Sequence, residues 1–218
     1  MSKQKISIVL ISLIIVVLLI VAFILIFKNG NNSRLLNMYE KIKSEQNFTF
    51  SMEEKGEEID YKVSMSQKGN DVSIDMYSDG EHTTTLILKN ASYYIMHEEQ
   101  EYYDFGGEEV DADILIDGLQ QITQKKHTTG NEEIDGSMYY YEEFENDGSS
   151  FIIFPDINED TKIKTRFYFD GDNIKYIKNI ITNNEEKEEE LIKAELKYSV
   201  DEKLFQLPED YAEAQDWY

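Results

Sequence analysis

The chain has 218 residues, 41% of them hydrophobic and 30% charged, with a formal net charge of −23 and no cysteine. This acidic balance disfavours nucleic acid as a partner and direct adhesion to an anionic membrane surface, because phosphate contacts need clustered lysine and arginine. The lack of cysteine excludes disulfides, thiolate nucleophiles, cysteine-based metal sites and a lipidated-cysteine anchor. The hydrophobic content and the 15 tyrosines favour a packed fold with one sizeable domain.

Residues 6–27 form an uninterrupted apolar segment that follows a short leader, residues 1–5. As a helix this segment would be about 33 Å long, which matches a hydrocarbon core of about 30 Å. A cleaved signal peptide, the alternative, has a shorter apolar region and a small-residue cleavage site. We therefore predict a transmembrane anchor. Lysines on both sides leave its orientation open, but a short leader before an acidic domain favours a single-pass protein of the cell membrane with an extracytoplasmic C-terminal domain.

Residues 28–32 are predicted to be a polar linker, and the domain that follows is predicted to cover residues 33–218. Asn32 or Ser33 can cap a helix that runs to about Gln46. One face of that helix is apolar and carries Leu35, Met38 or Tyr39, and Ile42.

From Phe48 the hydrophobic period changes to two, which indicates strands joined in antiparallel hairpins. Further short strands are expected at residues 83–89, 93–97 and 102–105. Alternation of this kind buries one face of a sheet and leaves the other in water. The side chains on the apolar face form the candidate ligand-binding surface: Phe48, Phe50, Met52, Tyr61, Val63, Met65, Ile74 and Met76.

The second half of the chain is predicted to contain one helix and a further set of strands. The helix covers residues 111–126, where apolar residues recur at helical spacing. Strands are expected at 138–144, 151–154, 162–170, 173–182 and 192–200. The acidic run at 183–190 predicts a solvated hairpin tip. The apolar segment KLFQLPEDY, residues 203–211, is expected to close one edge of the apolar face of the sheet.

Sequence motifs that would name a reaction are absent, so we predict that the protein is not an enzyme and needs no cofactor. Residues 156–160 resemble the start of a calcium loop, but the glycine and glutamate that such a loop requires do not follow. His82, His97 and His127 are isolated in sequence, and no metal site is predicted from them. Carboxylates are so abundant that a catalytic pair cannot be argued from their presence.

The order of these elements resembles that of the LolA-like bacterial lipoprotein-carrier superfamily. The resemblance covers roughly residues 33–211, and its carriers are NFTF at 47–50, EIDGSMYY at 133–140 and FQLPEDY at 205–211. It implies an α+β fold in which a strongly curved antiparallel sheet, an unclosed β-barrel, has helices on its concave side. In this chain one transmembrane helix would precede that fold. No functional residue of the family maps onto the sequence, so only the fold and the class of ligand carry over.

Two functions are compatible with this interpretation. The first is a membrane-anchored extracytoplasmic module that binds or senses an apolar ligand, an acyl lipid or a lipoprotein, in the half-barrel cavity, because methionine and aromatic side chains adapt to flexible ligands. The alternative is a non-enzymatic anchored sensor or assembly protein whose helices fill the cavity and whose acidic surface recognises a partner. The membrane would be contacted through the N-terminal helix, and the sequence identifies no protein partner.

Overall fold

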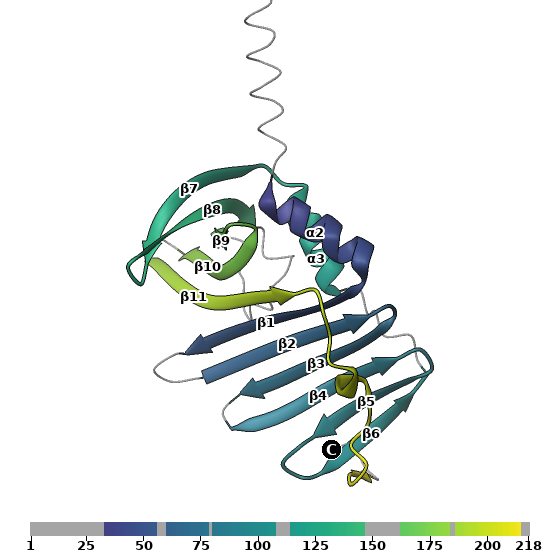
Figure 1. The fold of residues 1–218 in the computed structure, drawn as a ribbon. Helices are drawn as coiled ribbons and strands as arrows, with labels where there is room; N and C mark the ends of the chain where they lie inside the picture. The colour runs from purple at the N-terminus through teal and green to yellow at the C-terminus, as the bar shows by residue number, and fades with distance from the viewer. Residues whose placement is uncertain are drawn as a thin grey trace, which may run out of the picture. The chain divides into compact units, whose positions relative to one another are not determined.

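The computed structural model describes residues 33–55, 60–78, 80–107, 114–146, 162–183 and 186–214 (Figure 1). From Arg34 onward these residues belong to one compact unit, Arg34–Tyr218. The described part of this unit is dominated by one large sheet, and two α-helices pack against one of its faces.

The helices are α2 (Arg34–Glu45) and α3 (Ile114–Thr123), and a short 3₁₀ helix, η1, covers Glu202–Phe205. The strands in the described residues are β1 (Asn47–Lys55), β2 (Asp60–Lys68), β3 (Asp71–Ser78), β4 (Glu81–Leu88), β5 (Ala91–Met96), β6 (Glu101–Gly106), β7 (His127–Ile134), β8 (Ser137–Asn146), β9 (Lys162–Asp170), β10 (Asn173–Asn183), β11 (Glu186–Lys197) and β12 (Ala212–Glu213). The predicted hairpins from Phe48 onward are confirmed as β1 to β6, because their period-two alternation is strong.

The order of the strands in the sheet is β12-β6-β5-β4-β3-β2-β1-β11-β10-β9-β8-β7, with β12 and β7 at the two edges. Neighbouring strands are antiparallel except β12 and β6, which are parallel. The first six strands and the next five form two meanders, which join where β1 pairs with β11 and Phe50 stands opposite Leu196. Because side chains alternate along each strand, this register sends every second residue to the same face.

The face that carries α2 and α3, which we call the helix-bearing face, holds the main hydrophobic core. The two helices lie side by side (Figure 1). Their buried apolar residues are Leu35, Met38, Tyr39 and Ile42 from α2, and Ile116, Leu119 and Ile122 from α3. The sheet contributes Phe48, Phe50, Met65, Val72, Ile87, Phe144, Phe167, Phe169, Ile174, Ile177, Ile192 and Ala194. Residues three or four apart share one side of a helix, so each helix presents an apolar stripe to the sheet.

The first turn of α2 is held by a carboxylate from strand β8. Glu142 is fully buried and accepts hydrogen bonds from the backbone N–H groups of Arg34, at 2.6 Å, and of Leu35, at 3.3 Å. A negative group at this position satisfies free backbone donors and suits the positive end of the helix dipole. The sequence pattern suggested Asn32 or Ser33 as the cap; Asn32 lies outside the described residues, and the contribution of Glu142 is too distant in sequence for a local pattern to reveal.

The C-terminal segment, which we define as residues 199–214, crosses the face of the sheet opposite the helices (Figure 1). Thr49 Oγ1 donates to the backbone oxygen of Ser199 at 3.0 Å, and Lys68 Nζ lies 2.6 Å from a carboxylate oxygen of Glu202. The segment then continues past β3, against which η1 packs, and ends as β12 beside β6. Thr49 and Lys68 alternate with core residues, so the contacts lie on the second face.

This path corrects the expected role of the apolar segment at 203–211. Leu86 and Ile95 point away from the helices, yet they are only 0% and 2% exposed. A wide sheet has two faces, and apolar residues on both need a cover. The segment therefore covers the opposite face of β1 to β6 instead of closing an edge of the helix-bearing face.

The predicted fold class is wrong. The expectation was a curved half-barrel with helices on its concave side, preceded by a transmembrane helix. The described residues form mainly a large, open, antiparallel sheet of twelve strands with two helices. Across this described part of the chain, neither helix has the length and hydropathy needed to traverse a membrane. The predicted single-pass anchor and the predicted extracytoplasmic location at the cell membrane are corrected accordingly; residues 6–27 themselves lie outside the described residues.

Two local predictions in the second half also differ from the structure. Strand β7, HTTGNEEI, is not among the strands expected from the sequence because it lacks apolar alternation. It lies at the edge of the sheet and pairs with β8 alone, and edge strands commonly carry polar and charged residues. The acidic run at 183–190 is not only a hairpin tip, since β11 begins at Glu186 and pairs with β10. The strand predicted at 151–154 lies outside the described residues.

Candidate ligand-binding surface

The eight residues predicted to line a ligand surface all point to the helix-bearing face, since β1, β2 and β3 pair in register. Phe48, Phe50 and Met65 are 0%, 3% and 6% exposed and pack with the helices in the core. Met52 and Ile74 are partly buried against that core. The first three residues therefore serve the core, and any surface open to a ligand lies farther from the helices.

A row of partly exposed side chains crosses β1 to β5 at that distance. Met52, Val63, Met76, Thr83 and Met96 stand opposite one another on successive strands, and we call them the methionine row. Met76 is 42% exposed, and the other four are partly buried. Methionine is flexible and polarisable, so such a row can follow the irregular shape of an apolar ligand.

A pair of carboxyl groups stands beside one end of the row. Glu54 follows Met52 on the same face of β1 and shares a hydrogen bond with Glu190 of β11. Partial burial, the hydrogen bond and the charge of Glu190 together raise the pKa of Glu54 to about 7. Tyr61, directly opposite Glu54, has its pKa raised to about 12 by burial and by the two carboxyl groups. This polar end can exchange hydrogen bonds with the head group of an amphiphile.

A buried amide fixes the position of Glu190. Asn179 is fully buried, and its Nδ2 donates to Glu190 Oε2 at 2.9 Å. The hydroxyl of Thr165 in turn donates to Asn179 Oδ1 at 3.2 Å. Because these buried polar groups are hydrogen-bonded to one another, their burial carries little free-energy penalty. The amide of Asn179 thereby holds Glu190 beside Glu54.

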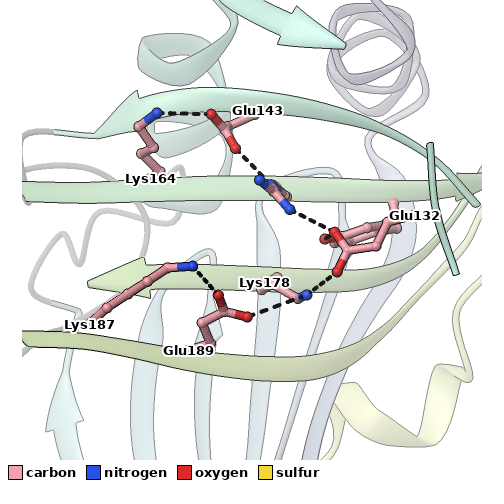
Figure 2. Close-up of polar contacts among 8 residues, drawn as sticks. Glu132, Glu143, Lys164, Lys178, Lys187 and Glu189 are labelled. Atoms are coloured by element: carbon pink, nitrogen blue, oxygen red, sulfur yellow. Dashed lines mark hydrogen bonds and ion pairs between the residues drawn. The ribbon is translucent and has the colours of Figure 1, made fainter. Parts of the chain in front are cut away.

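Charged side chains form a network on the opposite face of β7 to β11 (Figure 2). Arg166 joins two strands, because its Nε lies 2.6 Å from Glu143 and its Nη1 lies 2.6 Å from Glu132. Lys178 contacts Glu132 and lies 3.6 Å from Glu189. The remaining members are Lys164, Tyr168 and Lys187. Opposite charges are paired throughout, which favours a role in strand pairing over a role in ligand binding.

A second polar cluster, which was not predicted from the sequence, lies on the opposite face of β3 to β5. His82 and His97, isolated in sequence, flank the opposed pair Thr83 and Met96 and lie beside Asp75. Burial lowers the pKa of His97, and the nearby His82 lowers it further, while Asp75 acts in the opposite direction. The β4–β5 hairpin could have predicted this proximity, because a turn near residue 90 places residue 82 opposite residue 97.

No family model and no curated protein matches the sequence. Among solved structures, the chain is similar to an uncharacterized conserved protein from Thermus thermophilus. The similarity covers 83% of this chain and 96% of that protein, at 11% sequence identity and a TM-score of 0.47. The resemblance to LolA-like carriers stays a prediction.

Proposed function

We propose that the protein is a non-enzymatic binding protein for an acyl lipid or a lipoprotein, and that the apolar chain of the ligand lies along the methionine row. The observation that carries the proposal is the continuity of this row across five strands. Its end beside Glu54 and Glu190 supplies a polar site for the head group of the same ligand.

The energetics favour reversible binding. An acyl chain of about sixteen carbons contributes roughly 12 kcal/mol when wholly buried, at about 0.8 kcal/mol for each CH₂. A bilayer offers the same contribution, and a row open to solvent buries only one side of the chain. Transfer from a bilayer to the protein is therefore close to neutral or unfavourable, which suits exchange of a ligand better than storage.

A second candidate function has its own support. The burial of Phe48, Phe50 and Met65 under the helices leaves much of the helix-bearing face filled by the protein itself. In that case the protein would be a non-enzymatic sensor or assembly factor. The formal charge of −23 would then direct its acidic surface to a basic partner.

The test is a binding experiment on the full chain with a fluorescent sixteen-carbon fatty acid, together with mass spectrometry of lipid that copurifies. We expect saturable binding that Met76→Gln weakens several-fold. Leu191→Gln is the matched control, since Leu191 is 39% exposed, close to the 42% of Met76, but lies on the opposite face. Equal loss in both variants, or a purified protein free of lipid that does not bind the probe, would favour the second function.

A further inference from the structure

We propose that Asp75, His82 and His97 form a binding site for one divalent transition-metal ion of the Zn²⁺ type. The site lies on the face of the sheet opposite the helices, so the inference goes beyond the proposed function and does not depend on it. It rests on the positions of three ligand atoms, on the chemistry of those atoms and on the side chains that support them.

Neighbouring strands bring the three ligands to one point. Asp75 lies on β3, His82 lies on β4, and His97 directly follows β5. His82 Nε2 is 2.8 Å from Asp75 Oδ1. One ligand atom from each of the three residues lies within 4.8 Å of the other two.

The ring nitrogens converge on the same small group of oxygens. Thr84 Oγ1 lies 2.7 Å from Asp75 Oδ1 and 2.8 Å from His97 Nε2. The rings of His82 and His97 are stacked, with centroids 3.7 Å apart. The Nε2 atom of His82 contacts Asp75, and that of His97 contacts Thr84. A tetrahedral ion with bonds of about 2.0 to 2.2 Å holds its ligand atoms about 3.3 Å apart. The three ligand atoms lie within 4.8 Å of one another, so an ion would bind after the side chains rotate and the stacked rings tilt until both nitrogen lone pairs point at it.

The donor set selects a class of metal. Two imidazole nitrogens and one carboxylate oxygen leave a fourth position that the Thr84 hydroxyl or a water can fill. Imidazole ligands suit Zn²⁺, Cu²⁺ and Ni²⁺, whereas Mg²⁺ and Ca²⁺ take oxygen ligands. Zn²⁺ is the suitable probe because it has no redox chemistry.

Side chains around the cluster would orient the ligands. His97 Nδ1 lies 3.0 Å from the hydroxyl of Tyr211, and the ring of Tyr77 stacks on His82 with centroids 3.8 Å apart. Metal-binding histidines usually donate their second N–H to an oxygen acceptor, which fixes the tautomer and the ring orientation. Tyr211 belongs to the C-terminal segment, so a bound ion would also hold this segment against the sheet.

An ion can reach the site from solvent. The side chains of His82 and Asp75 are 20% and 24% exposed. The negative charge of the protein raises the local concentration of cations, and it also makes weak binding to scattered carboxylates the main competing explanation. A test must therefore distinguish the histidine site from the acidic surface.

The test is a calorimetric titration of the full, chelator-treated chain with ZnCl₂ in excess MgCl₂, which occupies scattered carboxylates. We expect one Zn²⁺ per chain, and we expect Asp75→Asn and His82→Gln each to weaken binding by at least about 10-fold. Tyr211→Phe should weaken it by about 10-fold, at the low end of the effect of removing an orienting group. His127→Gln is the control: it changes the third histidine, which lies on β7, and should bind as the wild type does.

A second measurement keeps the proposal testable if a variant fails to fold. Imidazole nitrogen resonances of the wild-type chain should shift on addition of ZnCl₂ for His82 and His97, while those of His127 stay in place. Wild-type affinity in both Asp75→Asn and His82→Gln would overturn the proposal. So would equal shifts of all three histidines, or no shift at all.

Discussion

Glu142 and Glu54 both lie on the helix-bearing face, but their carboxyl groups have different hydrogen-bond partners. Glu142 accepts two backbone N–H groups at the start of α2, which compensates for its complete burial. Glu54 has the carboxyl group of Glu190 as its neighbour. Ionisation of both groups would place two negative charges side by side, away from full solvation, so the proton stays on Glu54 up to about neutral pH.

We expect Glu54→Gln to stabilise the protein progressively as the pH rises. The folded-state pKa of about 7 exceeds the ordinary value of 4.5. The stability that the protonated group contributes is therefore fully present below pH 4.5 and is lost as the pH rises through 7. Glutamine keeps a hydrogen bond to Glu190 and does not ionise. Urea unfolding at about pH 4 and about pH 8 measures the difference.

The control for this change is Glu188→Gln, which removes an exposed charge from β11. The advantage of Glu54→Gln over this control should grow between pH 4.5 and 7 and then level off. A difference that is the same at both ends of the pH range would show that the carboxyl pair does not share a proton as described.

Paired charges link strands β7 to β11 on the face opposite the helices, beside buried side chains such as Tyr168 and Ile180. Partial burial raises the pKa of Glu132, but donors from Lys178, Tyr168 and Arg166 outweigh it, and the net shift is downward. The pKa of Glu143 is lowered in the same way by Arg166 and Lys164 against the effect of burial. Glu132 joins β7 to β9 and β10, and Glu143 joins β8 to β9, so the network stabilises the pairing of these four strands.

Glu132→Gln should destabilise the protein by about 1 to 3 kcal/mol near neutral pH, because Arg166 and Lys178 lose a charged partner. A lowered folded-state pKa means that this stability is present above the ordinary value of 4.5 and is lost as the pH falls through the folded-state pKa. The wild type and the variant should therefore converge in acid. Thermal unfolding across the acidic range measures this.

Lys187→Gln is the control within the same network. The side chain of Lys187 is 56% exposed, so its loss should cost less than about 1 kcal/mol. If Glu132→Gln cost no more than Lys187→Gln, or if its effect persisted unchanged in acid, the buried part of the network would not contribute as proposed.

The two faces of the wide sheet are partly covered, each by a different kind of element. Two helices pack on the helix-bearing face and leave the methionine row partly exposed, and the C-terminal segment crosses the other face of β1 to β6 (Figure 1). Leu86 and Ile95 are buried on that second face. The C-terminal segment is thus part of the packed structure, although it contains little regular structure.

Truncation after Tyr198 should destabilise the protein by roughly 3 to 6 kcal/mol. Leu86 and Ile95 would be exposed, and each contributes about 1.5 to 3 kcal/mol when buried. Urea unfolding and increased binding of a dye that detects apolar surface would measure the effect. Gln206→Ala, an exposed change within the same segment, should leave stability within about 0.5 kcal/mol of the wild type. A truncated chain as stable as the wild type would show that the C-terminal segment does not cover the sheet as described.

Prediction from the sequence succeeded where a local signal decided the outcome. The alternation of Phe48, Phe50 and Met52 indicated both a strand and the face that it buries. It failed for β7, because an edge strand needs no apolar alternation. The pattern of the strands alone also did not reveal that the helices bury Phe48, Phe50 and Met65. Binding of a ligand along the methionine row stays a prediction.

Local patterns in the amino-acid order were sufficient for the two apolar stripes of the helices, most of the hairpins and the face to which each strand residue points. These features depend on residues a few positions apart, whose geometry is set by the backbone. The folded chain was needed to show that β1 pairs with β11, that Glu142 caps α2, and that Asp75 joins His82 and His97 beneath Tyr211. Such contacts join segments that are distant in sequence. They are selected by the free energy of packing the whole sheet, which a local pattern of residues does not reveal.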